Sequence, residues 1–282
     1  MKSLILAILL ISNTFAAWTP SIAQQKEIHQ KVAVELNFKE LKKVIRKGLD
    51  PNFIFKDLNL ASSGVGSLNT TFGHMLSDRL MFDDMTVAER DIVFKMYRYL
   101  HKKGADFNMG TPSWAPVLAN FVSDSAQFYE ISQGESGYQK VRYENAHMLV
   151  EYLLVEVGVD VNKTVYYDKG LTALKYSVRK EGHSLFERLL RAGADVHDNG
   201  ECETYYVLFG GYKHYLQYDK NQLALKTFWP FYPLLREAGL DEEFCVDTHP
   251  LIKPAFGDPA RIPEHYNTFE PIPDEYEPYD FF

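Results

Sequence analysis

One short phrase occurs five times along this chain and divides it into units. Each copy has a glycine followed two residues later by an aspartate, and each closes a stretch in which apolar and polar residues alternate at helical spacing. A glycine just past a helix end adopts a left-handed conformation that other residues adopt only at a cost, and the Asp or Asn that follows favours a tight turn. The copies are Gly48-Leu49-Asp50-Pro51-Asn52, Gly104-Ala105-Asp106-Phe107-Asn108, Gly158-Val159-Asp160-Val161-Asn162, Gly193-Ala194-Asp195-Val196-His197 and Gly239-Leu240-Asp241. The chain is therefore predicted to repeat one structural unit.

The stretches before these glycines carry apolar residues at steps of three and four. Leu41, Val44 and Ile45 precede the first glycine, and Leu185 and Leu189 lie in the stretch before the fourth. This spacing places the apolar side chains on one face of a helix, so each unit is predicted to end in an amphipathic helix.

A second phrase lies before the fourth of these helices, at Gly170-Leu171-Thr172-Ala173-Leu174. Together the two phrases resemble the ankyrin repeat, whose inner helix opens with Thr-Pro-Leu-His and whose outer helix ends in Gly-Ala-Asp. Degraded copies of the opening are Thr71-Phe72-Gly73-His74, Thr111-Pro112-Ser113-Trp114 and Thr204-Tyr205-Tyr206-Val207. The resemblance covers roughly residues 26–244. It implies an all-α, ankyrin-like helical-repeat solenoid of about five helix-turn-helix units, in which His74 is a hydrogen-bonding structural residue. The alternatives are an unrelated array of helical hairpins and five helix ends that share the phrase by chance.

The spacing of the glycines indicates insertions. Gly158 and Gly193 are 35 residues apart, close to the roughly 33 residues of an ankyrin unit, whereas the other intervals are 56, 54 and 46 residues. Most of the excess is predicted between the two helices of a unit. The first interval also contains a long finger segment, Phe53–Asn69.

Residues 1–17 are predicted to be a signal peptide. Lys2 supplies the positive start, Leu4–Ile11 the apolar core, and Thr14-Phe15-Ala16 small residues near a cleavage site. The apolar run is much shorter than the roughly 20 residues that span a bilayer, so an uncleaved anchor is the minor alternative. The mature protein is expected in the periplasm or secreted, without membrane insertion.

The repeat domain is expected to span 18–245, followed by a tail at 246–282. The tail contains eight acidic and two basic residues, with seven of the 13 prolines. Proline does not continue a helix, so the tail is predicted to be extended. Two interpretations remain open: it wraps the last repeat, or it is an acidic arm that binds a basic partner through its aromatic residues Tyr276, Tyr279, Phe281 and Phe282.

The only two cysteines, Cys202 and Cys245, flank the last predicted unit. Antiparallel helices bring these points to the same end of a hairpin, so a disulfide is sterically plausible. Two thiols too far apart for a bond are the alternative. Two cysteines are too few for a structural zinc site, and no metal site is predicted.

Catalytic motifs are not recognised in the sequence, and the protein is expected to be neither an enzyme nor a cofactor binder. Gly134-Glu135-Ser136-Gly137-Tyr138 has Tyr138 where a nucleophile elbow requires glycine. The net charge of −8 argues against a nucleic-acid partner, which would favour a basic surface. A hydrolase on a helical scaffold remains a minor alternative.

The function implied by the resemblance is protein binding through the finger segments. Some exported bacterial ankyrin proteins are immunity proteins that neutralise a toxin, including lipase effectors of type VI secretion, and this role is expected here. The alternatives are an accessory factor protecting an envelope enzyme under stress, favoured by free cysteines, and a secreted effector that binds a host protein. Aromatic and apolar residues of the fingers, of the insertion near 212–228 and of the tail are the predicted contacts: Phe53, Phe55, Phe107, Met109, Tyr166, Tyr167, Tyr215, Tyr218, Tyr276, Tyr279, Phe281 and Phe282. For the finger pairs, the alternative is that the first residue of each, Phe53, Phe107 or Tyr166, packs inward.

Overall fold

The computed structural model is mostly helical. It describes residues 18–58, 68–81, 85–111, 114–125, 129, 138–164, 172–179, 182–205, 207–208 and 230–248. The predicted signal peptide, most of the predicted tail, and Tyr166, Tyr167, Tyr215 and Tyr218 lie outside these residues.

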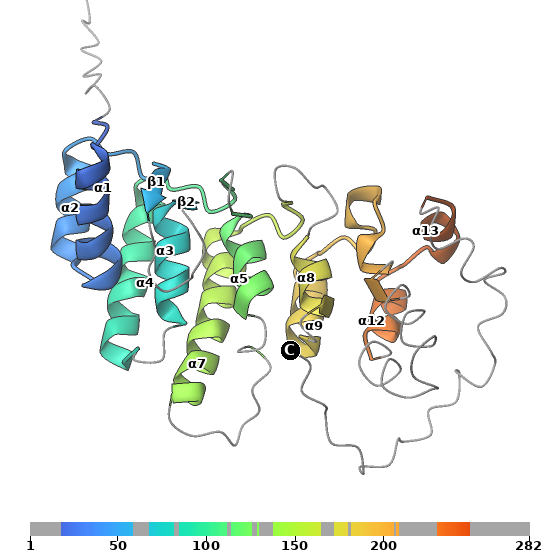
Figure 1. Ribbon diagram of the computed structural model, residues 1–282. Helices are drawn as coiled ribbons and strands as arrows, with labels where there is room; N and C mark the ends of the chain where they lie inside the picture. The colour runs from blue at the N-terminus through green and yellow to red at the C-terminus, as the bar shows by residue number, and fades with distance from the viewer. Residues whose placement is uncertain are drawn as a thin grey trace, which may run out of the picture.

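The helices follow one another in pairs along a single row (Figure 1). The α-helices are α1 (Ile22–His29), α2 (Phe38–Arg46), α3 (Phe72–Leu80), α4 (Val87–Lys102), α5 (Val117–Ser125), α7 (Tyr138–Glu151), α8 (Ala173–Arg179), α9 (His183–Arg191), α12 (Phe231–Glu237) and α13 (Glu242–Thr248). Two of them continue as π-helical turns, α1 into η1 (Gln30–Val34) and α7 into η2 (Tyr152–Val157), and η3 (Asp198–Gly200) is a 3-10 turn.

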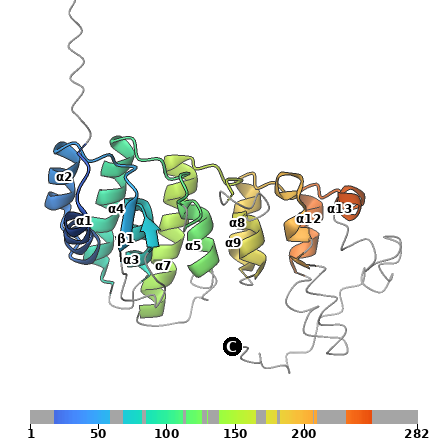
Figure 2. The same ribbon diagram turned by 45° about the horizontal axis from the view of Figure 1, so that its top comes forward.

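Contacts between the helices define two layers. In the inner layer, η1 packs on α3, α3 on α5, and α5 on α8. In the outer layer, α2 packs on α4, and α9 on α12. The pairs α3–α4 and α8–α9 connect the layers, and the turned view shows the same order of pairs along the row (Figure 2).

The first finger segment contains a short antiparallel hairpin of β1 (Phe55–Leu58) and β2 (Leu68–Thr70), in which Phe55 lies opposite Thr70. The sequence predicts a finger segment here, but the two strands were not predicted. Because α1 packs on β1, the hairpin is tied to the first helix pair.

Sequence signals explain why the helices begin and end where they do. All five phrase glycines have positive φ angles, between 70° at Gly158 and 102° at Gly48, which confirms the predicted left-handed C-caps. Helix α4 opens with a capping box, in which Thr86 and Glu89 each bond the other's backbone N–H. The predicted apolar faces are also buried: Leu41, Val44, Leu185 and Leu189 all belong to the core.

Candidate functional site: the turn edge

Each of the first four phrases forms the same closed turn. The aspartate carboxylate accepts the backbone N–H of the residue two positions later, which is the local hydrogen bond that favours Asp in turns. The N···O distances are 2.8 Å for Asp50–Asn52 and 2.9 Å for Asp106–Asn108, Asp160–Asn162 and Asp195–His197. This bond fixes the direction of the side chain at the fifth position of the phrase.

That fifth side chain bridges to the next turn. The amide oxygen of Asn52 accepts the backbone N–H of Asp106 at 2.6 Å. The equivalent bonds join Asn108 to Asp160 at 2.8 Å and Asn162 to Asp195 at 2.7 Å. Two of the side chains bond a second time, Asn52 to the Gly104 carbonyl at 3.0 Å and Asn162 to the Gly193 carbonyl at 3.2 Å. We call this series of bonds the turn ladder.

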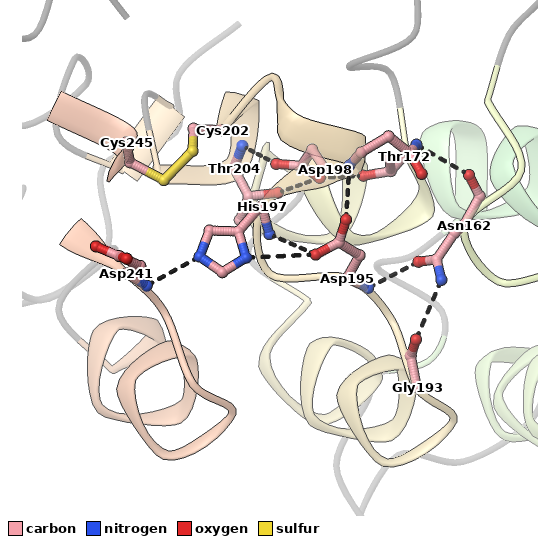
Figure 3. Close-up of polar contacts among 11 residues, drawn as sticks. Asn162, Thr172, Gly193, Asp195, His197, Asp198, Cys202, Thr204, Asp241 and Cys245 are labelled. Atoms are coloured by element: carbon pink, nitrogen blue, oxygen red, sulfur yellow. Dashed lines mark hydrogen bonds and ion pairs between the residues drawn. A yellow bond between two sulfur atoms is a disulfide. The ribbon is translucent and has the colours of Figure 1, made fainter. Parts of the chain in front are cut away.

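The last step of the ladder uses histidine in place of asparagine. Nε2 of His197 accepts the backbone N–H of Asp241 at 2.9 Å, while Nδ1 lies 3.5 Å from the Asp195 carboxylate. The imidazole therefore lies between Asp195 and Asp241 (Figure 3). An acceptor at Nε2 requires the neutral ring with its proton on Nδ1.

Replacing His197 tests whether the ladder depends on a hydrogen-bond acceptor at this position. His197→Asn should change the free energy of unfolding little, since asparagine makes the equivalent bond in three other turns. His197→Leu removes the acceptor and should cost about 0.5–1.5 kcal/mol, the usual net value of one hydrogen bond. Urea unfolding of both variants measures the difference, and an equal loss in both would show that the bond to Asp241 contributes nothing.

A buried carboxylate lies beside this step. Asp198 is fully buried and accepts hydrogen bonds from the Thr172 hydroxyl at 2.6 Å and from the Thr204 hydroxyl at 3.0 Å. The backbone N–H of Thr204 also donates to this carboxylate (Figure 3). Burial raises the pKa of Asp198 to about 6, while these hydrogen bonds and nearby Lys175 oppose the rise. Asp198 thus joins the fourth unit, through Thr172, to the beginning of the fifth.

Asp198 should make stability depend on pH in a definite direction. Its pKa is higher in the folded chain, about 6, than the ordinary value of 3.8, so the folded state binds the proton first as the pH falls. Relative to Asp198→Asn, the wild type should gain free energy of unfolding, on the order of 2–3 kcal/mol, between about pH 7 and pH 4. Urea unfolding of both proteins across this range measures the difference. A flat difference, or a fall toward acid, would contradict the assigned environment.

The two cysteines are bonded to each other. Cys202 and Cys245 form a disulfide with a Cα–Cα distance of 5.4 Å, and both are fully buried. The bond attaches α13 to the segment that opens the fifth unit (Figure 3). Of the two alternatives left open by the sequence, the structure contains the bridged one.

Two of the predicted binding residues are in the core instead of on the surface. Phe55 is fully buried and packs its ring edge-on against Phe53 and Phe72. Phe107 is 3% exposed and contacts the ring of Tyr97. Neither ring projects from the fingers: Phe55 packs against Phe72 of α3, and Phe107 packs against Tyr97 of α4.

Phe53 and Met109, the other predicted finger residues that the structure describes, are half-buried. Phe53 packs against the core, while Met109 lies partly exposed at the end of the second turn. Phe53 and Met109 lie on successive fingers along the chain. Tyr276, Tyr279, Phe281 and Phe282 are outside the described residues, like the four tyrosines named above.

His74 has the structural role that the resemblance implied. Its ring is fully buried, with Nδ1 accepting from the Thr71 hydroxyl at 2.8 Å and Nε2 donating to the Ala115 carbonyl at 2.6 Å. Burial lowers the pKa of His74 to about 4, so the ring is neutral near pH 7. The bond to Ala115 connects the second helix pair to the third.

Arginine–glutamate pairs connect α7 and the η2 turn that continues it with the neighbouring helices α4 and α9. Arg90 on α4 bonds Glu144 on α7 at 2.8 Å, and Arg188 on α9 bonds Glu151 on α7 through two nitrogens at 2.6 and 2.9 Å. Arg98 bonds Glu156 in the same way at longer distances. These charges of the outer face are engaged in contacts between units.

Within the residues that the structure places, no group of three potential metal ligands is found, and no helix is long and apolar enough to cross a bilayer. Comparison of the chain with protein-family models, with curated proteins and with solved structures finds no match.

Proposed function

We propose that this chain is an exported, ankyrin-like solenoid that binds another protein and has no catalytic activity of its own. Its most specific form is an immunity protein of the periplasm that binds and neutralises a toxic effector enzyme, such as a type VI lipase. The observation that carries the proposal is the turn ladder, because each turn is bonded in the same way to the turn of the next helix pair.

Repeated hydrogen bonds between successive turns are suited to a binding scaffold. In repeat proteins each unit contacts mainly its neighbours, and the stack presents an extended surface. The ladder and the buried bonds of His74 and Asp198 hold successive units at defined positions. A surface that is rigid before binding loses less conformational entropy when a partner docks.

The disulfide between the two cysteines argues against the main alternative, an accessory factor for envelope stress. A redox-active accessory factor for envelope stress would have accessible thiols, whereas Cys202 and Cys245 are buried and bonded to each other. A disulfide also agrees with an exported protein, since such bonds persist in oxidising compartments. Both points favour a binding scaffold over a redox role.

The test is affinity capture with residues 18–282 from an extract of the native cells, followed by an activity assay of the captured protein. We expect one stoichiometric partner, an enzyme whose toxicity falls as this chain is added. A housekeeping envelope enzyme would support stress protection instead, and the lack of any stoichiometric partner would contradict the proposal.

A pair of variants tests whether the partner binds through the fingers. Met109→Lys places a charge on the partly exposed finger edge and should weaken capture. The control Val155→Lys changes a residue of η2, away from the fingers, that is 66% exposed, and it should leave capture intact. Equal effects of the two substitutions would contradict binding through the fingers.

A further inference from the structure

The outer helices of the first two units carry cations at the same four positions. Counted back from the terminal glycine of each unit, the positions are nine, six, two and one. They hold Lys39, Lys42, Arg46 and Lys47 in the first unit, and Lys95, Arg98, Lys102 and Lys103 in the second. Because α2 packs on α4, the two sets lie at equivalent positions along two adjacent helices, and together we call them the cation strip.

This arrangement costs stability, since like charges on adjacent helices repel each other. Arg98 is relieved by its bond to Glu156. In contrast, Lys39, Arg46, Lys95 and Lys102 are exposed and form no ion pair with any residue that the structure describes. The equivalent positions of the third unit hold no cation: they are Leu149, Tyr152, Glu156 and Val157.

Aromatic rings lie among these cations. The ammonium group of Lys42 is 4.0 Å from the centre of the Phe38 ring, and that of Lys47 is 3.8 Å from the Trp18 ring. Lys103 lies 5.9 Å from the Tyr99 ring. The strip therefore offers positive charge next to aromatic surface, which suits a ligand that is both acidic and aromatic.

One segment of this chain is both acidic and aromatic. Residues 249–282 carry seven acidic and two basic residues and end with four aromatic residues among their last seven. Their 34 residues span at most roughly 110–120 Å when extended. Neighbouring helices in a stack are about 8–10 Å apart, so the segment is long enough to pass along the row of units.

We propose that the acidic C-terminal segment, residues 249–282, docks on the cation strip of α2 and α4. The contact joins the last part of the chain to the first two units of the same molecule, which the length of the segment allows. It goes beyond the proposed function, since it involves this chain alone and does not require a partner protein.

The location is tested on residues 18–282 with a zero-length carbodiimide, which joins lysine amines to carboxylates in contact. The expected products link Lys39, Lys95 or Lys102 to acidic residues of 249–282. A mixture of isotopically light and heavy protein tests whether the contact is intramolecular: only a contact between copies gives mixed products, and predominantly mixed products would overturn the proposal. Tail products distributed evenly over all exposed lysines, or no tail products, would overturn the proposal.

A second measurement uses variants and does not depend on reactive lysines. A dye attached at the C-terminus should have higher anisotropy in the wild type than in the strip variant Lys39→Gln, Arg46→Gln, Lys95→Gln and Lys102→Gln. A matched control removes four exposed cations elsewhere, Lys26→Gln, Lys140→Gln, Lys163→Gln and Arg191→Gln, and should behave as the wild type.

The salt dependence of the anisotropy is a further test. About 1 M NaCl shortens the Debye length to roughly 3 Å, so it should lower the wild-type anisotropy to that of the strip variant. Equal anisotropy in wild type, strip variant and control would overturn the proposal. Partner capture by the strip variant is scored separately, so failure of this contact is distinguishable from failure of the binding function.

Discussion

Removing the disulfide should lower the free energy of unfolding by about 4 kcal/mol. Cys202 and Cys245 are separated by 43 residues, and a crosslink over a loop of this length removes about that much conformational entropy from the unfolded chain. The closed loop contains α12 and the start of α13, so the fifth unit should lose the most. Urea unfolding of Cys202→Ala/Cys245→Ala beside the oxidised wild type measures the loss.

The control for this experiment is the wild type in the presence of a reductant strong enough to open the bond. It should unfold at the same urea concentration as the double variant, because both lack only the crosslink. A loss below about 1 kcal/mol in the double variant would contradict a stabilising role, since native disulfides in small exported domains contribute about 2–5 kcal/mol.

Truncating Phe107 should cost about 3–5 kcal/mol, the usual range for a buried Phe→Ala change. Phe107 is 3% exposed and packs against Tyr97, whose hydroxyl donates to the Gly73 carbonyl at 2.7 Å. Loss of the ring would open a cavity between the inner and outer helices of the second unit. Urea or thermal unfolding of Phe107→Ala measures the cost.

Met109 provides the matched control, because it lies two residues further along the same finger and is only half-buried. Met109→Ala should cost less than about 1 kcal/mol, as is usual for residues outside the core. A small loss for Phe107→Ala as well would mean that this ring lies on the surface, as its sequence position first indicated.

The predominantly helical fold was predictable because its signals are local. A glycine after an apolar face marks a helix end whatever its surroundings, and all five phrase glycines have the expected positive φ. The direction of the finger aromatics was not predictable from position alone. Phe107 turns inward because Gly73 leaves room for it: a Cβ atom at Gly73 would lie 3.0 Å from the Phe107 ring.

Contacts between units could not be predicted from the local sequence. The bond from Asn52 to Asp106 joins residues 54 positions apart, so no propensity indicates it. The repeated Asn at the fifth position of the phrase could have indicated these contacts, because its side chain bonds the backbone of the next turn. The pairing of Cys202 with Cys245 likewise required the relative positions of two helices.

The fold and the proposed function both depend on the turn ladder, and amide hydrogen exchange tests it directly. The backbone N–H groups of Asp106, Asp160, Asp195 and Asp241 point to side-chain acceptors of the preceding turn. Although Asp106, Asp160 and Asp241 are exposed residues, all four amides should exchange much more slowly than those of an unstructured peptide. His197→Leu should release Asp241 alone. Exchange of the four amides at the unstructured rate in the wild type would contradict a stack of units joined through their turns.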